Sequence, residues 1–227
     1  MMNIKLVKLV SFLFLFASAQ TFAQSSFDVK VGIASPMSDF GSEDQDNEEA
    51  GGAATGFNIG LKYTYQLSDN GIGLFAGLDF NYNGLKKDVR DDFEEEFENI
   101  GIMNAEYKFY RFINVPFSGG LNYTYVANDQ VALFANAGVT ANMLKVTDFE
   151  IAFSGVDVTS EYDLSSSIGF RAGAGVLFND QISVAIDYYG LGTHDLNGSV
   201  SADGVPSEDI EGDLTVNILT IRVGYTF

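Results

Sequence analysis

Apolar and polar residues alternate with a period of two along almost the whole chain, and this alternation restricts the fold more than any other feature. It is clearest between Phe57 and Tyr65, where Ile59 and Leu61 are separated by a glycine and followed by Lys62. The same pattern marks seven further segments, at residues 27–33, 74–82, 113–125, 131–143, 168–178, 182–188 and 219–227. We find no window of helical spacing long enough to predict a helix. The sequence therefore predicts an all-β chain of eight strands.

The connections between these segments alternate in length. Short links of turn-forming residues stand at 68–71, 128–130 and 179–181, whereas long links occupy 35–54, 85–106, 146–163 and 191–212. Asn, Asp and Gly favour sharp turns, and antiparallel strands can be joined by such turns. Short turns at one end and long loops at the other are typical of an eight-stranded antiparallel up-and-down transmembrane β-barrel, with its loops outside the cell.

The two faces of the predicted strands differ in polarity. One face is aliphatic or aromatic, and the other carries a few charged residues among glycines, serines and threonines, namely Asp28, Lys30, Lys62, Asp79, Arg171, Asp187 and Arg222. In a soluble sandwich or a lipocalin the apolar face would point inward. In a membrane barrel it points to lipid. Tyrosines and phenylalanines gather near the strand ends, as at a lipid–water interface, and this favours the membrane barrel. The nearly balanced charges then predict an ion-paired filling of the lumen.

The N-terminus has the features of a secretory signal peptide. Lys5 and Lys8 precede an apolar run at residues 9–19, and Thr21-Phe22-Ala23 provides small residues where a signal peptidase reads. The apolar run is shorter than the roughly 20 residues that a membrane-spanning helix needs. We therefore expect a signal peptide at 1–23 and an outer-membrane barrel domain at 24–227. Because the chain has no cysteine, it cannot be a lipoprotein.

These features, together with the closing Val223-Gly224-Tyr225-Thr226-Phe227, resemble the small outer-membrane β-barrel family of OmpA-like and porin-like proteins. The resemblance implies a place in the cell outer membrane, surrounded by lipid and lipopolysaccharide, and a monomer. It also implies insertion by the barrel-assembly machinery, for which Phe227 is the assembly signal. Because the family is broad in function, the resemblance implies a location and a shape and not an activity.

Acidic residues are concentrated in the predicted loops, and the formal net charge is −19. So acidic a chain should not bind nucleic acid. Divalent cations are possible ligands, because they prefer carboxylate oxygens. The candidate ligands are Asp44, Asp46 and Glu48. Their spacing is similar to that of a calcium loop, but the segment lacks the glycine and the distal glutamate of an EF-hand. In the alternative interpretation, the acids simply keep the exposed loops soluble and extended. We expect no cofactor.

The inventory for catalysis is small. His194 is the single histidine, and it stands beside Asp195 in the fourth predicted loop. A general base must be held in position, and a glycine-rich loop offers no evident scaffold. We therefore expect an exposed loop histidine and no enzyme, with a loop-based hydrolase left open.

Two local features do not fit regular strands. Pro116 lies inside a predicted strand, where it removes a hydrogen bond and suggests a bulge. Leu214, Val216 and Ile218 alternate out of phase with residues 219–227, which suggests a second bulge or a strand that leaves the membrane.

Two functional hypotheses remain. In the first, the chain is a structural or surface-interaction barrel with acidic extracellular loops and a closed lumen, since eight strands enclose only enough space for side chains. In the alternative, it is a small, cation-preferring, porin-like pore, for which the lumen glycines at 73, 77, 138, 169, 173 and 175 would leave room.

Overall fold

The computed structural model describes residues 25–44, 47, 50–202 and 205–227. In this part of the chain the strands are β1 (Ser25–Met37), β2 (Gly56–Gln66), β3 (Ile72–Asn83), β4 (Glu106–Lys108), β5 (Phe112–Asn128), β6 (Val131–Val146), β7 (Phe149–Phe153), β8 (Val156–Tyr162), β9 (Ser165–Phe178), β10 (Ile182–Ala202) and β11 (Val205–Thr226). The helical elements are a 3-10 turn, η1 (Ser38–Gly41), and one α-helix, α2 (Lys87–Asn99).

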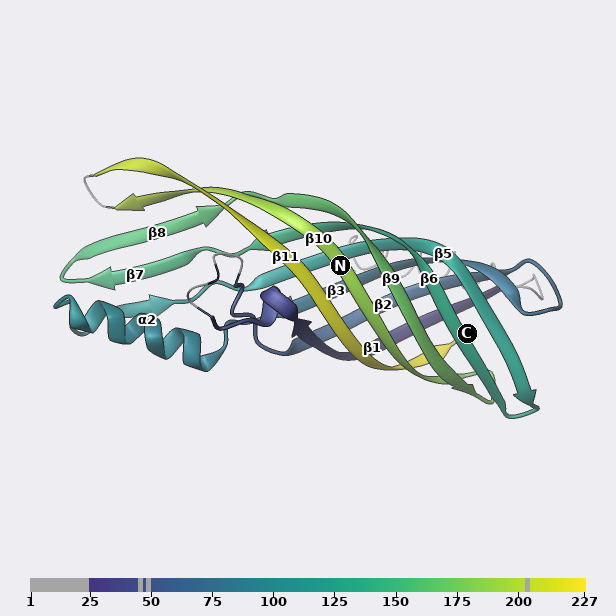
Figure 1. Ribbon diagram of the computed structural model, residues 1–227. Coiled ribbons are helices and arrows are strands. Elements are labelled where there is room, and N and C mark those ends of the chain that lie inside the picture. Colours follow the sequence, from purple (N-terminus) through teal and green to yellow (C-terminus); the bar gives the residue numbers. More distant parts are fainter. Residues whose placement is uncertain (1–24, 45–46, 48–49, 203–204) are drawn as a thin grey trace, which may run out of the picture.

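Eight of these strands close into a ring among the described residues. Their order is β11-β1-β2-β3-β5-β6-β9-β10, and β10 pairs back with β11. All pairs in the ring are antiparallel. The predicted eight-stranded up-and-down barrel is therefore confirmed (Figure 1).

The short connections all lie at one end of the barrel, which we call the turn end. Asn179 and Asp180, between β9 and β10, have φ angles of 49° and 56°. Two successive residues with positive φ form the type I′ turn, whose twist matches that of the flanking strands. Asn and Asp tolerate this conformation better than most residues, which explains their place in the sequence.

The opposite end, which we call the loop end, is more ordered than the sequence suggests. The predicted loop at 85–106 contains α2, and the one at 146–163 is the hairpin of β7 and β8. The prediction of a loop at 191–212 is wrong, because β10 and β11 stay paired through this region as one hairpin, up to the pair Ala202 and Val205. This end of the molecule carries α2, β7 and β8 (Figure 1).

Strand length explains why the hairpin of β10 and β11 extends beyond the ring. β11 has 22 residues, whereas crossing the apolar layer takes only about 9–11. Beyond the pair Met37 and Asn217, β11 has no further pairing with β1. The outer parts of β10 and β11 (residues 193–202 and 205–215), together with α2, β4, β7 and β8, form what we call the loop-end lobe.

The helix in this lobe was missed because its apolar residues are few. Phe93 and Phe97 lie one turn apart in an otherwise acidic segment. Phe93 packs against Phe109 and Phe149, with ring centroids 6.5 and 5.9 Å apart. The helix is therefore stabilised by this aromatic contact with the lobe and not by a long apolar face. No helix within the described residues is long and apolar enough to cross a membrane.

The two irregularities have different causes from those expected. The register between β3 and β5 is unchanged on both sides of Pro116, so the proline interrupts the ladder without a bulge. The pairing of β10 with β11 does contain a bulge, but the extra residue is in β10, between Gly190 and Thr193, and not in β11. β11 therefore keeps one phase throughout, and Leu214, Val216 and Ile218 point into the barrel like Arg222.

Candidate functional site: the barrel interior and the loop-end lobe

Four charged side chains meet at the centre of the barrel. Arg171 donates from Nε and Nη2 to Oδ1 of Asp187, at 3.0 and 2.9 Å, and from Nη1 to Oδ2 of Asp79, at 3.2 Å. Arg222 donates from Nη1 to Oδ1 of Asp79, at 2.5 Å, and from Nη2 to Oδ2 of Asp187. Each arginine thus bridges both aspartates. We call these four residues the central quartet.

The central quartet extends across the whole lumen. Asp79 lies on β3 and Asp187 on β10, which are four strands apart in either direction around the ring of eight. Each of the four residues is 2% exposed or less. The hydroxyl of Tyr189, which is fully buried, donates to Oδ2 of Asp79 at 2.9 Å. These side chains therefore fill the barrel at this level.

A second layer lies nearer the turn end. The ammonium groups of Lys30 and Lys62 both lie 4.8 Å from the ring centroid of Phe134, within the range of a cation–π contact. The ammonium nitrogens of Lys30 and Lys62 also lie 3.6 and 3.5 Å from Oδ2 of Asp28, so each lysine forms an ion pair with this aspartate. Phe134 comes from β6, which is opposite β1 in the ring. All seven residues that the sequence singled out on the polar face thus lie in these two layers.

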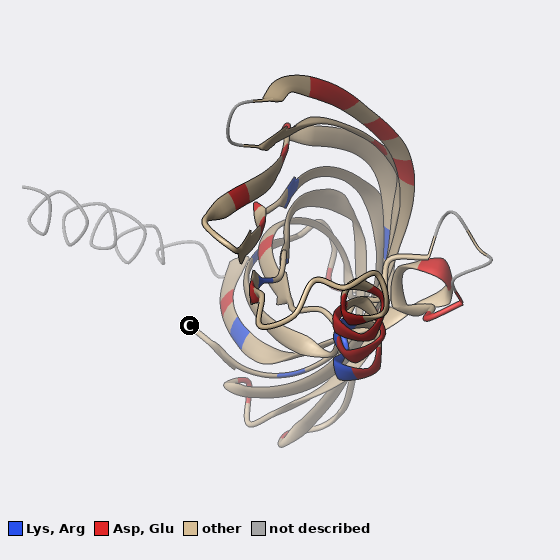
Figure 2. Ribbon diagram, turned by 90° about the vertical axis from the view of Figure 1, so that its left-hand side faces the viewer, with Lys and Arg blue, Asp and Glu red and all other residues tan. Residues whose placement is uncertain are grey.

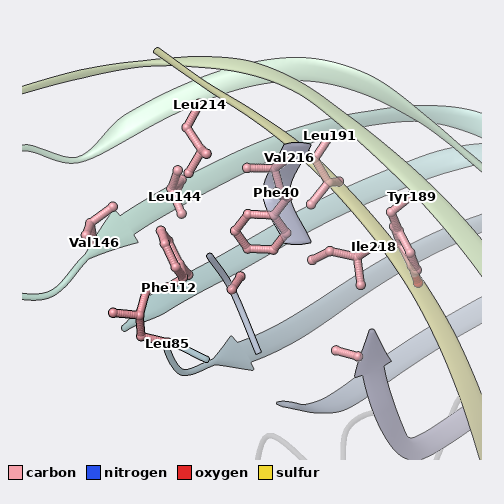
Figure 3. Packing of buried hydrophobic residues seen from close by; sticks show 12 residues of the cluster. Phe40, Leu85, Phe112, Leu144, Val146, Tyr189, Leu191, Leu214, Val216 and Ile218 are labelled. Carbon is pink, nitrogen blue, oxygen red and sulfur yellow. The ribbon is translucent and has the colours of Figure 1, made fainter. Parts of the chain in front are cut away.

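The third layer, at the loop end, is apolar. Phe40 on η1 folds back into the mouth of the barrel, where it is fully buried and packs edge-on against Phe112, with ring centroids 5.0 Å apart. Figure 3 shows Phe40 surrounded by side chains from the strands. The apolar cluster consists of Ala34, Phe40, Ala53, Leu85, Phe112, Leu144, Val146, Tyr189, Leu191, Leu214, Val216 and Ile218.

Glycines facing the lumen make room for charged side chains. A Cβ atom at Gly60 would clash with Oδ1 of Asp79, and one at Gly173 would lie 2.6 Å from Cγ of Asp187. A Cβ atom at Gly77 would lie 3.0 Å from Nη1 of Arg171. The space that these glycines leave is therefore occupied by the central quartet.

A methyl group at Gly173 should disturb this arrangement. We expect Gly173→Ala to lower the free energy of unfolding by about 1–3 kcal/mol, because Asp187 must move away from its arginines. Gly119→Ala is the matched control, since its Cβ atom would meet only an ordinary contact, 3.7 Å from the carbonyl oxygen of Phe75. Denaturant titration of both variants in lipid vesicles measures the difference. Equal stability of the two variants would contradict the tight packing at Gly173.

His194 is not an exposed loop residue, so that prediction is wrong. It lies on the continued β10 with its side chain fully buried. Its Nε2 is 2.9 Å from Nδ2 of Asn142 and 2.7 Å from Oγ of Ser167, and its Nδ1 is 3.3 Å from Oγ of Ser165. Ser167 and His194 have the atoms of a nucleophile and a base, and of the two the histidine is fully buried whereas the serine is half-buried. The contacts fit a structural polar network between β6, β9 and β10.

The loop-end lobe is strongly acidic. Figure 2 looks onto this end and shows Asp and Glu on the helix and on strands of the lobe. Among the predicted metal ligands, Asp44 is exposed, with its backbone N–H donating to Oγ of Ser42, whereas Asp46 and Glu48 lie outside the described residues. Within the described part, no group of three or more His, Asp or Glu is placed to hold a metal ion. The metal site stays a prediction.

Phe227 ends the chain on the outer surface of the barrel. It is 58% exposed, and its ring centroid lies 4.8 Å from that of Tyr225. Its backbone N–H donates to the carbonyl oxygen of Phe27 at 2.9 Å. The terminal aromatic side chain is thus accessible, and its role in assembly stays a prediction.

Sequence analysis missed two residues that matter inside the barrel and misplaced a third. Tyr189 is in phase with Asp187 but lies one residue beyond the predicted strand, and Phe40 belongs to a segment expected to be a loop. His194 was placed in a loop, although it lies on β10 beyond the bulge.

Comparison with known proteins places this fold. The family described as "Outer membrane protein beta-barrel domain" matches residues 9–227. None of the curated proteins compared with the chain matches it.

Three solved structures illustrate the similarity. The Neisserial surface protein A is 14% identical, with 89% of this chain and 95% of that chain covered and a TM-score of 0.46. Ail, the attachment invasion locus protein of Yersinia pestis, is 16% identical, with 90% and 99% covered and a TM-score of 0.40. A major outer membrane protein from Thermus thermophilus is 14% identical, with 89% and 99% covered and a TM-score of 0.44.

The outer surface of the barrel agrees with the family match. Large apolar side chains such as Val31, Ile59 and Leu121 are exposed on it, while the charged residues of the same strands are buried inside. Such an arrangement is stable where lipid surrounds the barrel. The chain belongs to the outer membrane protein beta-barrel domain family and is a protein of the bacterial outer membrane.

Proposed function

We propose that this protein is a closed outer-membrane barrel that holds the acidic loop-end lobe outside the cell as an interaction surface. The central quartet carries the proposal, because its side chains extend across the lumen from β3 to β10. A barrel filled in this way anchors and does not conduct. The ordered loop-end lobe supports the proposed interaction surface, because a surface that recognises partners needs a defined shape.

The alternative, a small cation-preferring pore, has less support. A pore needs a continuous path for water, and three layers of side chains occupy the lumen. Of the glycines that favoured the pore, Gly77 and Gly173 make room for Arg171 and Asp187 of the central quartet, and Gly175 lies against the ring of Phe134 in the second layer.

Several expectations stay predictions within this proposal. They are cleavage of residues 1–23, which lie outside the described part, recognition of Phe227 by the assembly machinery, a monomeric state, and divalent cations or lipopolysaccharide at the acidic loops.

Surface labelling tests the proposed orientation. Because the chain has no cysteine, single cysteines can be placed at will. We expect Glu95→Cys, on the exposed face of α2, to react with a membrane-impermeant maleimide on intact cells. Asp129→Cys, in the turn between β5 and β6, is the matched control and should react only after the outer membrane is opened. The reverse pattern would contradict the proposal.

A further inference from the structure

A cleft of about 340 Å³ lies in the loop-end lobe. It is formed by the connection before β5, by β8, and by the outer parts of β10 and β11, together with Ala50 and Gly51. This volume is in the range of small-ligand sites. Segments far apart in the sequence therefore build one concave surface.

The floor of the cleft is apolar and already formed. Phe112, Val146 and Leu214 line it, and all three belong to the buried apolar cluster. Tyr110 and Tyr162 pack against this cluster, and the ring of Tyr110 meets that of Phe112 edge-on, with centroids 5.4 Å apart. A ligand would therefore meet an apolar, largely aromatic surface that needs no rearrangement.

The carboxylates of β11 beside the cleft point away from it. Successive side chains of a strand lie on opposite faces. Ile210 and Leu214 share the face that lines the cleft, whereas Glu211 and Asp213 border the cleft but lie on the other face, where they are exposed. Glu208 shares the phase of Ile210 and does not line the cleft. Over its described length, β11 therefore directs no carboxylate into the cleft.

The lysine beside the cleft is also directed elsewhere. Lys145 follows Leu144 and precedes Val146 on β6, so it lies on the opposite face of the strand, and its ammonium group donates to the backbone carbonyl oxygen of Tyr162. Lys and Arg are absent from the described residues that line the cleft. A charged group of a ligand would find no counterion in this lining, which makes its burial unfavourable. The described lining therefore favours an uncharged ligand.

Two phenol groups of the lining are available for polar contacts. Neither the hydroxyl of Tyr110 nor that of Tyr162 makes a hydrogen bond with another described residue. Burial, with a smaller contribution from Tyr162, raises the pKa of Tyr110 to about 12, so this phenol stays neutral at physiological pH. Both hydroxyls can therefore donate to an oxygen atom of a ligand.

Gly212 leaves room on the side of β11. It lies between Ile210 and Leu214 in the sequence of the strand and shares their face. A Cβ atom at Gly212 would meet no other atom of the described chain within 4 Å. A side chain at this position would therefore occupy the cleft, and its absence keeps the apolar floor accessible.

We propose that this cleft binds an uncharged small molecule, in which an apolar ring system carries one hydroxyl or carbonyl group. The ring system lies on Phe112 and Leu214 in the space beside Gly212, and its oxygen atom accepts a hydrogen bond from Tyr110 or Tyr162. Contacts between aromatic rings favour a flat ring in this position. The inference rests on the proposed surface role, since the cleft must face the medium to meet such a ligand.

A set of naphthalene derivatives of nearly the same size tests this ligand class. Naphthylmethanol carries a hydroxyl group, methylnaphthalene no polar group, naphthoate a negative charge and naphthylmethylammonium a positive charge. Binding to the folded protein in detergent is followed by the fluorescence of the probe, which tryptophan does not obscure because the chain has none. We expect naphthylmethanol to bind most tightly and each charged probe to bind about 10-fold or more weakly.

Filling the cleft separates binding from partition of the probe into micelles. Gly212→Leu should abolish binding and keep the heat-modifiable gel shift of the folded barrel, because the new side chain enters open space. Gly84→Leu is the matched control and should bind like the wild type. A Cβ atom at Gly84 also meets no other described atom within 4 Å, and Gly84 does not line the cleft.

The double variant Tyr110→Phe, Tyr162→Phe tests the hydroxyl groups independently of the filled variant. Both rings remain, so methylnaphthalene should bind as before, while the preference for naphthylmethanol should fall by about 2–10-fold for each hydroxyl that donates. Equal or tighter binding of a charged probe, equal signals from wild type and Gly212→Leu, loss of binding in Gly84→Leu, or an unchanged preference in the tyrosine variant would overturn the proposal. Because these measurements use purified protein, their failure is distinguishable from a failed surface labelling on cells.

Discussion

Replacing Arg222 with methionine is expected to lower the free energy of unfolding by about 3–5 kcal/mol. The side chain is 2% exposed and donates to both Asp79 and Asp187. Without it, two aspartates share the single Arg171, and a negative charge is left in the buried interior of the barrel. Methionine keeps most of the length of the side chain, so the loss reports the missing charge and its hydrogen bonds.

Denaturant unfolding in lipid vesicles, followed by circular dichroism and by the gel shift, measures this loss. Asp187→Asn in the Arg222→Met background should recover part of it, because one positive and one negative charge then remain in the central quartet. The coupling between the two sites is expected to be about 0.5–3 kcal/mol. Arg111→Met removes an exposed arginine and should cost no more than about 1 kcal/mol. Additive losses at Arg222 and Asp187 would contradict the paired geometry.

The second large effect is expected at Phe40. Replacing it with alanine in the wild-type protein should lower the free energy of unfolding by about 3–5 kcal/mol. Phe40 is fully buried against Phe112, and its carbonyl oxygen accepts a hydrogen bond from the N–H of Ala53 at 3.0 Å. The substitution leaves a cavity at the mouth of the barrel and removes the contact that holds η1 inside. Amide hydrogen exchange should therefore accelerate at Gly51 and Ala53, while the strands at the turn end keep their protection.

Phe40→Leu is the control for this prediction. Leucine keeps an apolar side chain in the cluster and should cost clearly less than alanine. If Phe40→Ala unfolds at the same denaturant concentration as the wild type, the apolar layer does not stabilise the mouth of the barrel.

The barrel itself could be predicted from the sequence because its strands follow one repeating rule. Alternation with a period of two assigns every residue to lipid or lumen, and the short Asn-Asp turns set the register. The seven lumen charges were therefore identifiable from phase alone. Which charges pair with each other could not be predicted, because the contact of Asp79 with Arg222 depends on how the strands are placed around the ring.

The loop end could not be predicted in the same way. The helix α2 depends on a tertiary aromatic contact with Phe109 and Phe149, which no local pattern records. The bulge in β10 between Gly190 and Thr193 changes the phase of that strand, so His194 was placed in a loop although it is buried. The loop-end lobe also contains a cleft lined by Tyr110, Tyr162 and Leu214. The first and the last of these residues are separated by about 100 positions in the sequence, and periodicity does not show that such distant residues lie side by side.

Single-channel recording of the folded protein in a planar bilayer tests most directly the claim that the lumen is closed. Folding is first confirmed by the heat-modifiable gel shift, so that a silent bilayer cannot be attributed to unfolded chains. The central quartet, the layer of Lys30, Lys62 and Phe134, and the apolar cluster around Phe40 together predict no stable conductance steps. Reproducible, cation-selective steps from the folded wild-type protein would contradict the closed barrel and favour the pore.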